Sequence, residues 1–165
     1  MTTQLTACFM TMFLIGVSSL SAQAQNSKRS IASLTGISTL FVVVEQLPDG
    51  AKLLSLTAET IQTDVELKLR QAGLRVVTPE AGVKLPGSPY VYVDLNLTDN
   101  AQAASVEIEL RQNARLEPNG QFVLGVTTWN VGDIIWKPTA QGIRDNIKDG
   151  VDLFLNAWSS VNPKN

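Results

Sequence analysis

The residues of this chain whose types and spacing could do chemistry are carboxylates. Glu107 and Glu109 are two positions apart in a stretch that alternates apolar and polar side chains. On a strand both carboxylates would share one face, about 7 Å apart. Such a pair can hydrolyse glycosides when an apolar environment raises the pKa of one acid. Because Arg111 and Arg115 follow on the same face, the pattern favours a solvated charged face over a catalytic pair.

Other acids give weaker signals. Asp94 and Glu45 each occur singly in an apolar stretch, without an identifiable catalytic partner. The cluster Asp94, Asn96, Asp99 and Asn100 offers oxygen ligands, but its spacing is more typical of a polar turn than of a calcium loop. The sequence contains no P-loop, dinucleotide fingerprint, G-x-S-x-G elbow or EF-hand motif. We therefore expect no catalytic residue, no cofactor and no metal site.

Composition excludes further chemistries. The 165 residues include no His, and the single cysteine and the three methionines all lie in the first twelve residues. Without that segment the chain cannot form a Ser-His-Asp triad, a thiol nucleophile, a disulfide, a thiolate or imidazole zinc site, or haem ligation by Cys, Met or His. The net charge is −2, from 15 acids and 13 bases. That balance argues against a nucleic-acid partner.

Residues 1–24 have the pattern of a secretory signal peptide. They carry no charged side chain, and residues 7–17 form an apolar core of suitable length. Ala22 and Ala24 supply the small residues of a cleavage site. We predict cleavage after Ala24 and a periplasmic or secreted product. The apolar core is too short for a transmembrane helix, so we expect no transmembrane segment in the mature form.

Cys8 offers an alternative to simple cleavage. Residues 5–8, Leu-Thr-Ala-Cys, resemble a lipobox, in which the cysteine would be acylated. A lipobox follows its apolar region, whereas here most of the apolar region follows Cys8. The pattern therefore favours Cys8 as a small apolar residue of the signal peptide.

The first half of the mature chain predicts a β-α-β unit. Residues 25–36 are small and polar and predict a flexible arm, so residues 37–165 would form a single domain. Residues 40–44 form an apolar, β-branched run typical of a strand covered on both faces. Thr57 can cap a helix that ends at Gly73, and residues 74–78 predict a second strand parallel to the first.

The second half predicts antiparallel strands and a long helix. Period-two alternation marks strands over 90–98 and 105–117, and a Pro-Asn-Gly turn leads to a return strand over 121–131. Residues 139–160 carry a continuous apolar stripe of helical period. We predict an α+β two-layer sandwich of order β-α-β-β-β-β-α, with a mixed sheet and two amphipathic helices on one face.

Aromatic side chains define the candidate interaction surface. Alternation places Tyr90 and Tyr92 on the face of their strand opposite its apolar residues. It places Trp129 on the polar face of the return strand, and Trp136 lies in the loop before the last helix. Tyr and Trp on a surface are common anchors of protein interfaces. The alternative for both tryptophans is that they cover the end of the sheet or pack beneath the loop. Trp158 lies on the apolar stripe of the last helix and predicts a core position.

Several segments resemble a group of small exported bacterial proteins of unknown function: residues 42–45, 63–70, 72–74, 89–93 and 161–164. The order of elements is also similar to periplasmic adaptor domains, namely the N-terminal domain of TolB and the auxiliary lipoproteins of envelope ABC transporters. The resemblance covers most of the mature chain and implies no activity, and the likeness to the adaptor domains is one of topology only. It departs from the lipoproteins in lacking a properly placed lipobox cysteine.

These observations favour a periplasmic protein-binding or adaptor domain without catalysis, whose partner is an envelope protein. A carrier that holds a small ligand or lipid between helices and sheet is the first alternative. A carboxylate-type hydrolase is the second. The sequence leaves the oligomeric state open.

Overall fold

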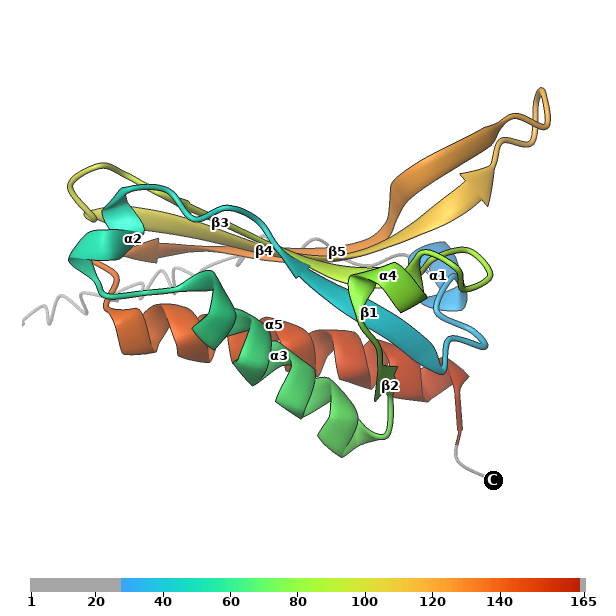
Figure 1. Cartoon of the computed structure of the whole chain (residues 1–165), viewed down its shortest axis with the longest axis horizontal. Helices are drawn as coiled ribbons and strands as arrows, with labels where there is room; N and C mark the ends of the chain where they lie inside the picture. Colours follow the sequence, from blue (N-terminus) through green and yellow to red (C-terminus); the bar gives the residue numbers. More distant parts are fainter. Residues whose placement is uncertain (1–27, 164–165) are drawn as a thin grey trace, which may run out of the picture.

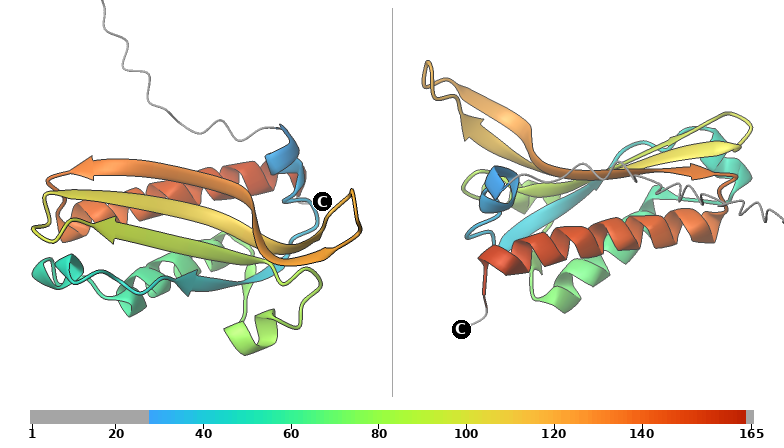
Figure 2. Two further views of the ribbon diagram at one scale, coloured as in Figure 1. Left: turned by 90° about the horizontal axis from the view of Figure 1, so that it is seen from above. Right: turned by 180° about the vertical axis from the view of Figure 1, so that it is seen from behind.

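The computed structural model describes residues 28–163. The predicted signal peptide, with Ala22 and Ala24, lies outside the described residues. A five-stranded sheet forms one layer, and the helices α3 (Ala58–Ala72) and α5 (Ala140–Val161) form the other, together on one face of the sheet (Figure 1). The opposite face is largely uncovered (Figure 2, left). The chain thus has the α+β architecture that the sequence predicts.

The sheet is mixed, with strand order β2-β1-β3-β4-β5. Its strands are β1 (Thr39–Val44), β2 (Arg75–Val76), β3 (Tyr90–Leu97), β4 (Ala103–Arg115) and β5 (Phe122–Trp136). Strand β1 runs parallel to β2 and β3, whereas β3, β4 and β5 are antiparallel. Both the β-α-β unit and the antiparallel second half are therefore confirmed. The tip of the β4–β5 hairpin projects beyond the two layers (Figure 1).

The long helices begin and end at the predicted residues. The Thr57 side chain accepts a hydrogen bond from the Thr60 amide at 3.2 Å, which caps α3. Gly73 closes that helix at φ 102°, a conformation that favours glycine. Thr139 caps α5 by accepting from the Gly142 amide at 3.0 Å. Each cap satisfies an amide that a helix N-terminus leaves unpaired.

The core lies between the helices and the sheet. From α3 it takes Ile61, Val65 and Leu69; from α5 it takes Ile143, Ile147, Val151, Phe154 and Trp158; and from β3 and β4 it takes Val91, Val93, Leu95, Val106, Ile108 and Leu110. Trp158 is buried as predicted, and its indole N–H donates to the Ile37 carbonyl at 2.7 Å. At Gly150 the helix α5 approaches β4 so closely that a Cβ would lie 2.9 Å from Ile108.

The prediction of a flexible arm over 25–36 is wrong for the part that the structure describes. Residues Lys28–Ala32 form the short helix α1, and Leu34 is fully buried. The Asn162 amide nitrogen donates to the Leu34 carbonyl at 3.0 Å, and its oxygen accepts from the Gly36 amide at 2.7 Å. The polar composition of this segment hid Leu34, which anchors it to the core and to the end of α5.

Two further short helices lie in regions that the sequence assigns to turns or loops. They are α2 (Gly50–Leu53) and α4 (Pro79–Gly82). Helix α4 lies against Phe41 on the face of β1 opposite the core, so close that a Cβ at Gly82 would meet the Phe41 ring at 2.1 Å. This contact explains the continuous apolar run of β1, because Leu40 and Val42 face the core while α4 covers Phe41.

Candidate functional site

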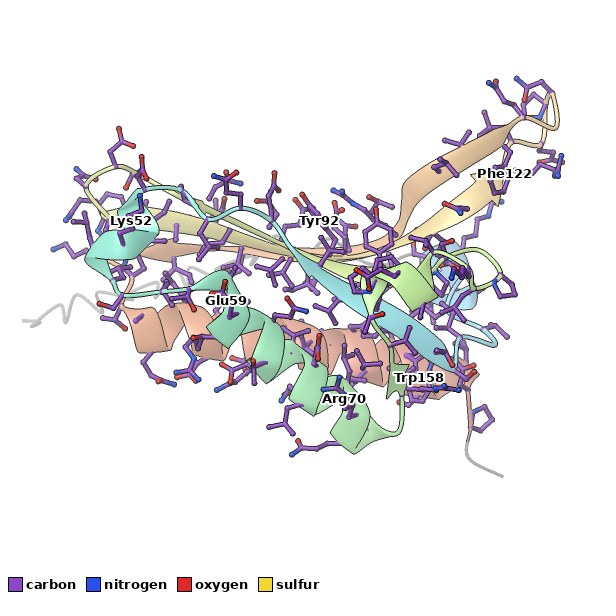
Figure 3. All side chains as sticks on the ribbon, viewed as in Figure 1. Lys52, Glu59, Arg70, Tyr92, Phe122 and Trp158 are labelled. Atoms are coloured by element: carbon purple, nitrogen blue, oxygen red, sulfur yellow. The ribbon has the colours of Figure 1, made fainter. Side chains whose placement is uncertain are left out.

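The open face of the sheet carries the polar side chains of the three longest strands. Cross-strand pairing places Tyr90 beside Arg111, Tyr92 beside Glu109, and Asp94 beside Glu107. In Figure 3, Tyr92 lies on the sheet face opposite the helices. Tyr90 stacks on Phe41 with ring centroids 4.9 Å apart, and it meets Tyr92 edge to face at 6.4 Å. Both tyrosines therefore lie on the predicted face, and both are half-buried.

Tyr92 is held in a network of charged groups. Its hydroxyl donates to Glu45 Oε2 at 2.5 Å, and the Arg111 guanidinium lies 3.7 Å above its ring centroid. The hydrogen bond to Glu45, with partial burial, raises the pKa of Tyr92 to about 12. Arg111 in turn donates from Nε to Glu109. These contacts fix the orientation of the Tyr92 ring within the sheet surface.

Trp129 is not on the surface, which corrects the predicted phase of β5. It is buried in the core and packs edge to face on Phe154, with ring centroids 5.4 Å apart. The cause is a β-bulge: Leu110 pairs with Trp129, but Arg111 pairs with Thr127, so Thr128 is an extra residue. One extra residue inverts which side chains face the helices. Sequence periodicity alone does not reveal it.

Trp136 is exposed as predicted, at 72% of its surface, but it is the last residue of β5 rather than part of a loop. It pairs with Ala103, whereas Tyr90 pairs with Arg111, eight residues further along β4. The four predicted aromatic residues therefore do not form one surface. Trp136 instead neighbours Ile134, which is 78% exposed on the same strand face.

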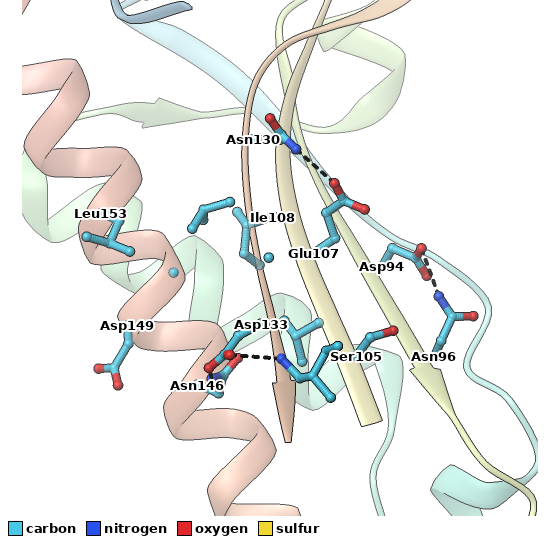
Figure 4. A pocket seen from close by; sticks show the side chains of 15 residues that line it. Asp94, Asn96, Ser105, Glu107, Ile108, Asn130, Asp133, Asn146, Asp149 and Leu153 are labelled. Atoms are coloured by element: carbon cyan, nitrogen blue, oxygen red, sulfur yellow. Dashed lines mark hydrogen bonds between the residues drawn. The ribbon is translucent and has the colours of Figure 1, made fainter. Parts of the chain in front are cut away.

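A hollow of about 680 Å³ lies around the outer edge of β5, between the open sheet face and α5 (Figure 4). Gly132 lines the hollow without a side chain, and a Cβ there would lie 3.8 Å from Glu107. Ile134 and Leu153 supply its exposed apolar side chains. The sequence does not predict this hollow, because the exposed position of Ile134 follows from the bulge in β5.

The charged residues that line the hollow are all acids: Asp94, Glu107, Asp133 and Asp149. Asparagine amides donate to three of them: Asn96 to Asp94 at 3.1 Å, Asn130 to Glu107 at 2.9 Å, and Asn146 to Asp133 at 2.7 Å (Figure 4). Within residues 28–163, no lysine or arginine forms an ion pair with any of the four. Neutral donors hold the carboxylates without compensating their charge.

The pKa of Asp94 rises above its usual value. Partial burial is the main cause, and the neighbouring Glu45 and Glu107 carboxylates add to it. Asp94 and Glu45 are single acids in the sequence, but the structure brings them together, because β3 pairs with β1 and Glu45 directly follows β1. Burial and the neighbouring Glu45 and Glu107 carboxylates therefore disfavour the charged form of Asp94.

Glu107 and Glu109 share the open face, as their spacing predicts, but their surroundings differ. Glu109 is buried rather than solvated, because it accepts from Arg111 and, at 3.1 Å, from the Thr127 hydroxyl. Glu109 therefore belongs to a hydrogen-bond network on the sheet face, whereas Glu107 lines the hollow. The two carboxylates do not line the same hollow.

The described residues include neither a membrane-spanning helix nor a cluster of metal ligands. None of the helices among them is long and apolar enough to cross a membrane. The acids among them do not gather in groups of three or more that could hold a metal ion. In comparisons with known proteins, no family model, no curated protein and no solved structure matches this chain.

Proposed function

We propose that this chain is an exported, non-catalytic adaptor that binds an envelope protein at the outer edge of β5. The observation that carries the proposal is the set of exposed apolar side chains beside the hollow: Ile134, Trp136 and Leu153, exposed at 78%, 72% and 40%. Apolar side chains that gather next to a concave polar surface are typical of protein contact sites. The predicted signal peptide supports export.

Quantitative co-purification tests this proposal. The variant Ile134→Ser, Trp136→Ala removes the apolar rim, and Leu53→Ser, Leu67→Ser removes two similarly exposed apolar residues from α2 and α3. We expect the first variant to lose the partners that co-purify with the wild type, as measured by mass spectrometry. The second should retain them, and circular dichroism should show both variants folded. Equal retention in both variants would refute the proposal.

A carboxylate-type hydrolase is the second candidate, and Asp94 is the residue that favours it. A carboxyl whose pKa is raised beside a second carboxylate has the character of a general acid. If this candidate is right, the wild type should hydrolyse one of a panel of chromogenic glycosides, and Asp94→Asn should abolish the turnover. The carrier alternative has no specific observation in its favour, because core side chains fill the space between helices and sheet.

A further inference from the structure

The outer edge of β5 has backbone groups that β4 does not use. The Lys137 amide donates to the Gln102 carbonyl across the β4–β5 ladder at 2.8 Å. In an antiparallel ladder the backbone amide and carbonyl of every second residue bond to the neighbouring strand. The amides and carbonyls of the odd-numbered residues from 129 to 137 therefore point toward β4. The even-numbered Gly132, Ile134 and Trp136 then direct their amides and carbonyls outward. The Ile134 amide follows this pattern, because it donates to the side chain of the preceding residue, Asp133, at 2.8 Å and not to β4.

Asp133 therefore occupies one of these outward-facing groups, the Ile134 amide. Its carboxylate accepts from the Ile134 amide through Oδ1 and from the Asn146 side chain through Oδ2, at 2.8 and 2.7 Å. A carboxylate beside an edge strand is a common protection against unwanted strand pairing. A cation that draws this carboxylate away would release the Ile134 amide for a partner's carbonyl. The charge of the hollow and the accessibility of its strand edge are thereby linked.

We propose that the edge of β5 binds an extended, basic segment of the partner polypeptide, which adds a strand beside β5 and places lysine or arginine side chains in the hollow. This inference rests on the proposed function, and it assigns the chemistry of the partner. Charge complementarity selects the occupant, because the four acids that line the hollow have no basic ion-pair partner among residues 28–163. Ile134, Trp136 and Leu153 accommodate apolar side chains of the same segment.

Two other occupants fit less well. Residues 1–27 of the chain carry no charged side chain and cannot complement the acids. A second copy joined edge to edge at β5 would bring Asp133 and Asp149 of each copy toward the same acids of the other, and like charges at such a contact disfavour association.

Fluorescence anisotropy with labelled peptides tests the inference. The probe is a capped heptapeptide, Thr-Lys-Val-Lys-Val-Lys-Thr, compared with versions in which Gln or Glu replaces each Lys. We expect the Lys peptide to bind at least tenfold more tightly than the Gln peptide, and the Glu peptide not to bind. Added salt should weaken the binding of the Lys peptide.

The variant Glu107→Gln, Asp133→Asn should weaken the binding of the Lys peptide at least tenfold. The matched variant Glu59→Gln, Glu117→Gln removes the same charge from exposed positions outside the hollow and should change affinity less than twofold.

Each contrary result overturns the inference. Equal binding of the three peptides, or an equal loss in the two variants, would show that the hollow does not select a basic segment. Spermidine that displaces the Lys peptide at equal concentration would show a site for small cations instead. Failure of all three peptides to bind would exclude strand addition at this edge. The co-purification result with Ile134→Ser, Trp136→Ala is independent of these outcomes, so the adaptor function can stand when the basic segment is refuted.

Discussion

The indole of Trp129 packs edge to face against the phenyl ring of Phe154, and this contact joins β5 to α5 at the centre of the core. Aromatic pairs of this geometry contribute more than their buried area alone. The indole N–H is buried without a hydrogen-bond partner among the described residues. Trp129 therefore contributes through packing rather than through a polar contact.

We predict that Trp129→Ala lowers the free energy of unfolding by about 3–5 kcal/mol, because it leaves a cavity beside Phe154. Trp129→Phe should cost much less, because it keeps an aromatic ring and removes an unpaired donor. Trp136→Ala, at an exposed position, should change stability by no more than about 0.5 kcal/mol. Urea denaturation of the three variants measures this. A similar loss for Trp129→Ala and Trp136→Ala would contradict the buried position of Trp129.

Tyr92 should titrate at unusually high pH. In a Tyr90→Phe background it is the only tyrosine of the chain, so its absorbance near 295 nm reports one group. We expect a pKa of about 12 in the folded protein, because the phenol donates to Glu45. Glu45→Gln should lower this pKa toward the ordinary value of about 10. An unchanged titration in that variant would show that Glu45 does not hold the phenolic proton.

The ion pair Asp64–Arg144 should make the free energy of unfolding depend on pH in the acidic range. Arg144 donates from two nitrogens to the two Asp64 oxygens, at 2.7 and 3.1 Å, and so links α3 to α5. The hydrogen bonds from Arg144 hold the pKa of Asp64 below its usual value. The contribution of this pair is therefore complete above the unfolded-state pKa and disappears as pH falls through the lower folded-state pKa.

We expect Asp64→Asn to lower the free energy of unfolding at pH 7 by about 1 kcal/mol, the size typical of a partly exposed pair with good geometry. The difference between wild type and variant should shrink at pH values below about 4, the ordinary pKa of aspartate. Denaturation curves at pH 7 and pH 3 measure it. A difference that stays constant between these pH values would contradict the linkage.

Asp133 should keep the chain from associating through β5. Asp133→Ala leaves the Ile134 amide without its side-chain acceptor at a strand edge that is free to pair. We expect this variant to self-associate at concentrations where the wild type sediments as a smaller species. Asp133→Asn removes the charge but keeps an acceptor oxygen for the Ile134 amide, so it should associate less than Asp133→Ala in sedimentation velocity. Equal association of both variants would assign the protection to the charge of Asp133 rather than to its hydrogen bond.

The sequence was sufficient to predict the five strands and the two long helices because their signals are local. The caps at Thr57 and Thr139, the C-terminal Gly73 and the apolar stripe of α5 depend on residues a few positions apart. Alternation along β3 likewise identified its buried and exposed faces. These patterns reflect periodicity and capping, which act within one element.

The candidate site was largely beyond prediction because its geometry depends on contacts between elements. The bulge at Thr128 arises from the pairing of β5 with β4 and reverses the exposure expected for Trp129. Leu34 appears in a polar segment, and only its contact with the core shows its role. The hollow combines residues of β3, β4, β5 and α5, so no local pattern announces it.

Site-specific photocrosslinking tests the central claim most directly. A photoreactive residue would replace Ile134 or Trp136 at the edge of β5, and in matched controls Leu53 or Leu67, which are also exposed but lie on helices. We expect positions 134 and 136 to capture one and the same protein in the cells that express this chain, and positions 53 and 67 not to capture it. Capture of that protein equally from all four positions, or only from the helices, would contradict binding at the β5 edge.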